Sequence, residues 1–521
     1  MHHLTRAALS LRRTLSLTLA LTATATTALV ALPTVTTATA APRPVAAGLQ
    51  QLPLQSSPAA TTGRVSSAGD RTLLSPRRST RPFSLMGVTW AADPAVGEVE
   101  VQVRHRSGGH WSAWEPVEAG HDDGPDPRSA DTRGGLRPGT VPIWTGPSDG
   151  VQVQVEAVDG AAPRDLRIEL IDPGRSPADA SVAGVAAPRS TAHAEAPAPE
   201  IIRRAQWGAD ESIRTEAPSY GPTPRVGFVH HTASSNDYSA DQAAAMVRGI
   251  YAYHVRSNGW SDIGYNVLVD RFGRAYEGRA GGLDRFVVGA HTGGFNRDSF
   301  GVSLLGDFST VPPSAKTLDT LTDVLAWKLG QAYAEPGGTA VLTSSGGGTS
   351  RYAAGQTAVF DVVSGHRDAG NTSCPGATTY ARMGQIREQV SAKLGLGFVG
   401  PALASTRLST GSRGPVVLRS TARGPVSWTA TVSDREGNLL QSRSGTAGPG
   451  SQVSSSWDLT DATGQPVPNG TYLVRLTGSG GGDRALPWST EVVVGAVACR
   501  GTPLQRAACL AARRAPVAGP G

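Results

Sequence analysis

The sequence predicts a multidomain protein: a central α/β domain with a mixed β-sheet flanked by helices, preceded by a β-sandwich domain and followed by an Ig-like β domain. Three observations support this fold class. The chain has 521 residues, more than one hydrophobic core normally supports. Apolar residues alternate with period two near both ends of the chain and recur at helical spacing between them. Stretches rich in Pro, Ala and Ser separate these parts, as linkers do.

Composition narrows the class of protein. Charged residues make up 17% of the chain, and the 63 Gly and 37 Pro are typical of extracellular modules joined by loose linkers. The net charge of +6 has two interpretations, simple solubility or attraction to an acidic polymer or surface. Because Lys and Arg do not cluster with interleaved aromatic residues, we expect no nucleic-acid partner.

Residues 1–40 have the pattern of a signal peptide. A basic region with Arg12 and Arg13 precedes an apolar stretch at 15–32, and small residues at 38–40 offer a cleavage site. We therefore expect a secreted or cell wall-associated protein with no stable membrane anchor after cleavage. The choice between Sec and twin-arginine export stays open.

Next comes a predicted all-β region. Residues 41–80 are rich in Pro, Ala, Ser and Thr without periodicity, which predicts a disordered leader. From 81 to 172 the pattern has period two, as at Val99, Val101 and Val103, and predicts a β-sandwich domain. Its tryptophans can pack the core or bind sugar. We favour packing, because aromatic side chains dominate core energetics.

A second linker at 173–199 leads into the α/β domain at 200–398. Strands are predicted at 226–229, 265–270, 275–277, 287–291, 301–305 and 359–363. Helices are predicted after a capping box at Ser239 and Gln242, around 318–329, and over 380–394. The Gly- and Ser-rich insertion 335–357 is predicted to be a mobile flap or an ornament beside the site. His254 lies on the buried face of the first helix and is expected to be structural.

The last part returns to strands. Residues 399–498 contain strand patterns, with clean alternation at 470–476, and predict the Ig-like β domain. A C-terminal tail at 499–521 contains Cys499 and Cys509. In an oxidising compartment these two can form a disulfide across a short loop. That leaves Cys374 as the odd cysteine, and metal ligation is one reason to keep an odd cysteine in a secreted protein.

Histidines and this cysteine suggest a metal site. His230 and His231 end an apolar run, while His366 and Cys374 lie eight positions apart on a Gly-interrupted loop. Two histidines and one cysteine can make a three-ligand Zn²⁺ site that keeps a fourth position open for water. A histidine or cysteine considered alone is more often packed or inert than a ligand, so this pattern needs support from the rest of the chain.

Seven motifs give that support. They are AQWGA at 205–209, VHHTA at 229–233, GWSDIGYN at 259–266, YEGR at 276–279, GAHT at 289–292, the run 296–306, and GHRD through CPG at 365–376. In this order they resemble the peptidoglycan recognition protein and type 2 N-acetylmuramoyl-L-alanine amidase family, which includes phage amidase lysozymes. The resemblance covers residues 200–395 and neither β-domain. The C-terminal domain is similar, more weakly, to Ig-like domains of bacterial surface proteins.

The resemblance implies roles for individual residues. His230, His366 and Cys374 would be the Zn²⁺ ligands. Tyr265 would assist catalysis by hydrogen-bonding the developing oxyanion, and Thr372 matches a position occupied by Thr or Lys in active members. Some distant members carry a glutamate where this chain has Ser303, which leaves the proton-transfer group open.

Three more residues are expected on the substrate side. His291 and Asn296 would line a groove for the glycan and the stem peptide. His231 is grouped with them as a candidate, with a structural role beside the ligands as the alternative.

The function implied is zinc-dependent hydrolysis of the amide between N-acetylmuramic acid and L-alanine in peptidoglycan, by a protein expected to be a monomer. Two alternatives remain: a non-catalytic peptidoglycan-binding protein, and a metallopeptidase that cuts within the stem peptide. Retention of all three ligands disfavours the non-catalytic alternative, and product analysis separates the metallopeptidase.

Overall fold

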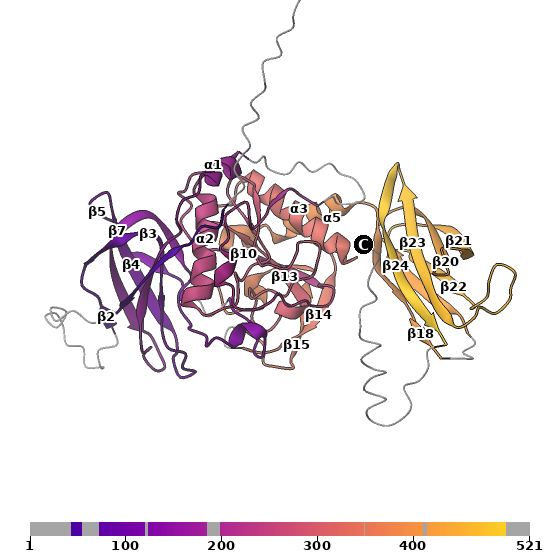
Figure 1. Cartoon of the computed structure of the whole chain (residues 1–521), viewed down its shortest axis with the longest axis horizontal. Coiled ribbons are helices and arrows are strands. Elements are labelled where there is room, and N and C mark those ends of the chain that lie inside the picture. The colour runs from indigo at the N-terminus through magenta and orange to yellow at the C-terminus, as the bar shows by residue number, and fades with distance from the viewer. Residues whose placement is uncertain are drawn as a thin grey trace, which may run out of the picture. The chain divides into compact units, whose positions relative to one another are not determined.

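The computed structural model describes residues 43–54, 72–119, 123–184, 198–347, 350–409 and 414–495 (Figure 1). All of them fall within a single unit of the chain that starts at Pro42. The predicted signal peptide and the predicted Cys499–Cys509 disulfide lie outside these residues. Within the described ranges, no helix has both the length and the apolar character needed to cross a membrane.

The N-terminal domain is all-β, as predicted. Its strands are β1 (Gly48–Pro53), β2 (Thr72–Leu74), β3 (Arg78–Thr89), β4 (Val99–Ser107), β5 (His110–Trp111), β6 (Glu115–Val117), β7 (Ile143–Ala157) and β8 (Arg167–Asp172). Antiparallel hydrogen bonds join the described strands into one sheet of order β1-β8-β3-β7-β4-β5, with β2 also paired to β7 and β6 to β4. The period-two valines of β4 and β7 pack into one core. Two tryptophans, Trp90 and Trp144, are buried as expected of packing residues.

Two segments predicted to lack regular structure contain it. The predicted leader 41–80 contains β1, β2 and the start of β3, so that prediction was wrong there. Strand β1 pairs with β8 at the far end of the domain, Gly48 opposite Asp172, and a local pattern cannot show such a partner. The predicted linker 173–199 contains α1 (Ala178–Ala183), a helix too short to display a helical period.

The central domain has the predicted mixed sheet. Its strands are β9 (Ile201–Ile202), β10 (Val226–His231), β11 (Val267–Val269), β12 (Ala275–Glu277), β13 (Ser299–Leu304) and β16 (Val363–Gly365), and its helices are α2 (Ala243–Ala252), α3 (Ala315–Gln331), α4 (Ala377–Tyr380) and α5 (Met383–Leu394). The sheet order is β16-β10-β13-β11-β12-β9, in which only β11 and β12 of the described strands pair antiparallel.

Helices cover both faces of this sheet, and Figure 1 shows α2, α3 and α5 around β10 and β13. Strand β11 illustrates why. Val267 and Val269 join the core cluster that includes residues of α3 and α5, whereas Leu268 joins the cluster of α2. Successive strand side chains point to opposite faces, so a fully apolar strand needs helices on both sides.

Three local predictions in this domain can be compared with the structure. The predicted strand 287–291 is wrong: Val287 makes a single bridge to Tyr220, and a turn follows. The insertion 335–357 contains β14 (Thr339–Thr343), which pairs with β15 (Thr357–Asp361) as a hairpin, so its first part is regular rather than a loose flap. His254 is structural as expected, because its buried ring accepts a hydrogen bond from the Gly264 N–H at 3.1 Å.

The C-terminal domain has two sheets. One contains β17 (Phe398–Leu403), β19 (Val416–Ala422) and β22 (Gln452–Trp457), and the other contains β18 (Arg407–Leu408), β20 (Val426–Ser433), β21 (Leu439–Ala447), β23 (Gly470–Gly480) and β24 (Asp483–Val494). Apolar residues from both sheets share two core clusters. The all-β character is thus confirmed, and Ig-like topology stays a prediction.

Candidate metal centre

Two neighbouring parallel strands deliver the histidines. His230 and His231 are the last residues of β10, and His366 directly follows β16. The two strands run parallel with Val229 opposite Gly365. Because parallel strands end at the same edge of a sheet, the imidazoles of His230 and His366 lie together, with ring centroids 4.5 Å apart.

Cys374 joins them from the loop that follows His366. Its carbonyl oxygen accepts the Arg367 N–H at 3.0 Å, which folds the loop back. The Cys374 Sγ lies 3.8 Å from the His230 Nδ1 and accepts the His231 backbone N–H at 3.3 Å. One ligand atom from each of His230, His366 and Cys374 lies within 4.8 Å of the others, and all three residues are buried.

This donor set fits Zn²⁺. Burial lowers the pKa of His230 to about 3, with a further contribution from His231, so the His230 imidazole is neutral as a metal ligand must be. Two imidazoles and one thiolate are the soft-to-borderline ligands that zinc prefers. His230, His366 and Cys374 are therefore the residues that would hold the ion.

His291 lies behind His230 and orients its ring. The His230 Nε2 lies 3.2 Å from the His291 Nδ1 and 3.3 Å from the Thr292 Oγ1, which leaves the His230 Nδ1 facing Cys374. Asn296 supports this arrangement, because its Oδ1 accepts the His291 N–H at 2.7 Å. His291 and Asn296 are fully buried, and their place along a substrate groove stays a prediction.

His231, the third residue expected on the substrate side, is placed away from His230. It neighbours His230 on a strand, so its side chain points to the opposite face. There its Nδ1 accepts the Phe308 N–H at 3.2 Å, and the residue is buried. These contacts are those expected of a structural residue, and a substrate-side role for His231 stays a prediction.

Replacing His291 should test its orienting role. We expect His291→Ala to weaken zinc binding roughly 10–100-fold, the usual effect of removing a residue that holds a metal-binding histidine. Competition with a chromophoric chelator measures it, with His254→Ala as a control for loss of a buried histidine elsewhere. Equal affinities in wild type and His291→Ala would contradict the assignment.

The two residues predicted to assist catalysis also border the ligands. Tyr265 lies just before β11, and its ring centroid is 5.6 Å from that of His230. The Thr372 Oγ1 accepts the Cys374 N–H at 3.0 Å, which links Thr372 to the cysteine loop. Ser303 is buried opposite His230 in the β10–β13 register.

Sequence reasoning missed the acids around this centre. They come from the β6–β7 loop, of which residues 118–119 and 123–142 are described. The Asp123 Oδ2 accepts a hydrogen bond from the Tyr265 hydroxyl at 2.5 Å, and its Oδ1 lies 3.5 Å from the His230 Nδ1. Burial raises the pKa of this carboxyl group, whereas His366 and the Tyr265 hydrogen bond act in the opposite direction. The sequence shows only a loop of the β-domain that contains acidic residues, and such a loop is normally an exposed turn.

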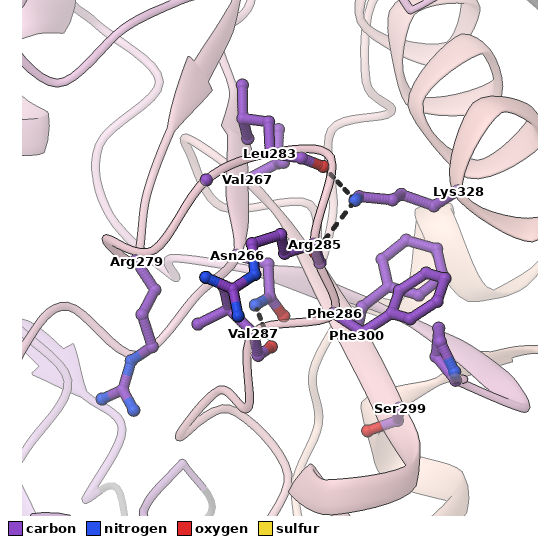
Figure 2. A pocket seen from close by; sticks show the side chains of 12 residues that line it. Asn266, Val267, Arg279, Leu283, Arg285, Phe286, Val287, Ser299, Phe300 and Lys328 are labelled. Carbon is purple, nitrogen blue, oxygen red and sulfur yellow. Dashed lines mark hydrogen bonds between the residues drawn. The ribbon is translucent and has the colours of Figure 1, made fainter. Parts of the chain in front are cut away.

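A separate pocket lies elsewhere in the central domain. Figure 2 shows Lys328 of α3 pointing toward the loop that carries Leu283 and Arg285, whose carbonyl oxygens accept hydrogen bonds from its ammonium group. Burial lowers the pKa of Lys328 to about 8. Phe286 and Phe300 also line this pocket, which contains none of His230, His366 and Cys374 and so is not part of the metal centre.

Two family descriptions match the chain. Residues 36–193 match the Rv3811 N-terminal galactose-binding domain-like family, and residues 220–377 match the N-acetylmuramoyl-L-alanine amidase family. The second match contains all three candidate ligands.

Known relatives are similar in the same region. Peptidoglycan-recognition protein SC2 of Drosophila simulans is 33% identical over 183 residues, covering 34% of this chain and 82% of that protein. Human peptidoglycan recognition protein 3 is 30% identical over 26% of this chain and 38% of its own length. The solved structure of wild-type Drosophila PGRP-LB is 25% identical, with a TM-score of 0.28, over 35% of this chain and 92% of that one. By its identity to SC2 over most of that protein, the chain belongs to the peptidoglycan recognition protein and N-acetylmuramoyl-L-alanine amidase family.

Proposed function

We propose that this protein is a zinc-dependent N-acetylmuramoyl-L-alanine amidase that acts on peptidoglycan as a secreted or cell wall-associated enzyme. The observation that carries the proposal is the assembled set of His230, His366 and Cys374, buried with their ligand atoms within 4.8 Å of one another. A protein that only bound the wall would have no need of a buried thiol and two imidazoles converging on one point.

The chemistry follows from the residues. When bound, zinc supplies a Lewis acid for the scissile carbonyl and lowers the pKa of a coordinated water toward about 7. His291 and Thr292 keep the His230 ring in its orientation. The Tyr265 hydroxyl can donate a hydrogen bond to the carbonyl oxygen as negative charge develops there. Thr372 holds the backbone N–H of Cys374 and so fixes the thiol.

The second candidate is a non-catalytic peptidoglycan-binding protein. It is supported by the names of the relatives, which are recognition proteins. In that case the metal set would be a structural remnant, and cell wall would be bound without being cut.

Product analysis of purified cell wall should separate these functions. Incubation with the full chain is expected to free the amino group of L-alanine while the glycan strands keep their length, as measured by mass spectrometry of the released material. Cys374→Ser serves as the matched inactive control. Cleavage within the stem peptide would instead identify a metallopeptidase. Wall binding with no product released by either the wild-type chain or its Asp123→Ala variant would identify a recognition protein.

A further inference from the structure

We infer that Asp123 of the N-terminal domain is the fourth ligand of the metal centre, and that the β6–β7 loop thereby holds the enzyme in a closed, latent form. The inference rests on the proposed zinc site. It goes further by assigning the fourth position, expected to be open, to a carboxylate from another domain of the same chain.

The interatomic distances carry this assignment. The Asp123 Oδ1 lies 3.5 Å from the His230 Nδ1 and 3.4 Å from the His366 Nδ1. Both distances exceed the 2.7–3.2 Å range typical of a hydrogen bond. Nitrogen and oxygen ligands bound tetrahedrally at about 2.0–2.1 Å lie roughly 3.3–3.4 Å apart. This oxygen therefore lies at the spacing of a fellow ligand from both imidazole nitrogens.

The same oxygen otherwise has an unfavourable environment. The Asp123 Oδ1 is buried and has no hydrogen-bond partner among the described residues. An isolated buried carboxylate oxygen is costly unless it is paired or coordinates a metal. Coordination accounts for this oxygen, while the other carboxylate oxygen accepts the Tyr265 hydroxyl.

The loop is attached to the central domain on both sides of Asp123. Before it, the Glu118 Oε1 accepts the Thr372 hydroxyl at 3.1 Å and the Ser373 N–H at 3.2 Å, both on the cysteine loop. After it, the Asp126 Oδ1 accepts the Gly294 N–H at 2.9 Å. The position of Asp123 next to the ligands is therefore fixed by contacts on both sides of it in the loop.

A buried ion pair adds a further attachment. Asp131 accepts two hydrogen bonds from the Arg279 guanidinium, at 2.9 and 3.0 Å, and both side chains are buried. Arg279 belongs to the YEGR motif that marks the family resemblance. The loop thus binds a central-domain residue from one of the motifs that carry the family resemblance.

Three residues predicted to act on substrate are engaged by the loop. The Tyr265 hydroxyl donates to Asp123, the Thr372 hydroxyl donates to Glu118, and the Asn296 Nδ2 donates to Asp126 at 2.8 Å and to the Gly124 carbonyl oxygen at 2.9 Å. A substrate carbonyl needs the same metal position and the same tyrosine hydroxyl. The loop and the substrate therefore compete, and the loop must leave before the amide can enter.

An alternative hypothesis is that Asp123 is the general base. Some distant family members carry a glutamate where this chain has Ser303, so the proton acceptor is otherwise unassigned. A general base accepts a hydrogen bond from the attacking water, so that water would lie between the base and the metal. The Asp123 Oδ1 instead lies at ligand spacing from both imidazoles. The two hypotheses predict opposite effects of replacing Asp123. Turnover should rise if Asp123 closes the site, and it should fall if Asp123 is the base.

Cobalt substitution of the full chain tests the assignment directly. The visible spectrum of Co²⁺ reports the ligands, and azide reports an accessible coordination position. We expect wild type to resist azide, and Asp123→Ala to change spectrum and bind azide at least about tenfold more tightly. Zinc affinity should also fall by about 10-fold or more, since even supporting residues contribute 10–100-fold.

Two further variants serve as controls. Asp123→Asn preserves the size of the side chain if the alanine variant folds poorly. Asp149→Asn, which removes a partly exposed partner of Arg106 in the same domain, is the matched control.

Turnover on a muramoyl-peptide substrate gives the second readout, and the two can fail separately. We expect Asp123→Ala to exceed wild type by about tenfold or more, because an open site binds substrate without first displacing the loop. Cobalt that becomes azide-accessible without any amidase activity would uphold the closed site and overturn the proposed function. The inference would be overturned, whatever the activity, if both Asp123 variants had the cobalt spectrum and azide response of wild type. It would also be overturned if wild type already bound azide and Asp123→Ala lost turnover.

Discussion

Cys374→Ser should remove zinc and amidase activity together. A neutral hydroxyl is a poor replacement for a thiolate, and Cys374 supplies the only sulfur among the ligand atoms of the site. Zinc affinity should therefore fall by more than the roughly 10–100-fold effect of outer residues, with activity falling in proportion to bound metal. Elemental analysis after dialysis against a chelator, beside a turnover assay, measures both quantities.

The control for this variant is Asn371→Ala on the same loop. Asn371 is exposed and its side-chain oxygen contacts Arg351, so its loss should leave zinc content and activity unchanged. Circular dichroism and the thermal midpoint establish that Cys374→Ser is folded. Near one zinc per chain and full turnover in Cys374→Ser would show that the cysteine is not a ligand.

Tyr265→Phe should lower kcat by roughly 10² or more while zinc content stays the same. The phenyl ring keeps the packing against His230 and removes only the hydroxyl, which is the group proposed to stabilise the oxyanion. Because that hydroxyl also donates to Asp123, the comparison is best made twice, in wild type and in the Asp123→Ala background. The loss should persist in the second background, where the loop no longer occupies the hydroxyl.

Tyr238→Phe is the matched control for this second prediction. Its hydroxyl is buried and donates to the Leu305 carbonyl oxygen, away from the ligands, so its loss should leave kcat near the wild-type value. Unchanged turnover in Tyr265→Phe in both backgrounds would mean that the tyrosine is a packing residue and that the oxyanion is stabilised by other groups.

The sequence by itself determined the domain order, the main elements of the α/β domain and the candidate ligands. Helix and strand periods depend on neighbouring residues, so α3, α5, β10 and β13 could be recognised from local patterns. His230 and His366 follow short apolar strands, and the ends of neighbouring parallel strands meet at one edge of a sheet. Their convergence with Cys374 was therefore within reach of the sequence, helped by motifs that resemble a known family.

Only the tertiary structure decided which distant segments complete the site. His291 lies in a stretch that looked like a strand, and its role beside His230 depends on a turn that the pattern does not reveal. Asp123 lies in a loop of another domain, more than one hundred positions before the first ligand. Charged loop residues normally face water. The sequence of a loop looks the same whether its acids are exposed or are buried against another domain. Burial against a second domain is a long-range contact, and no property of the local chain encodes its partner.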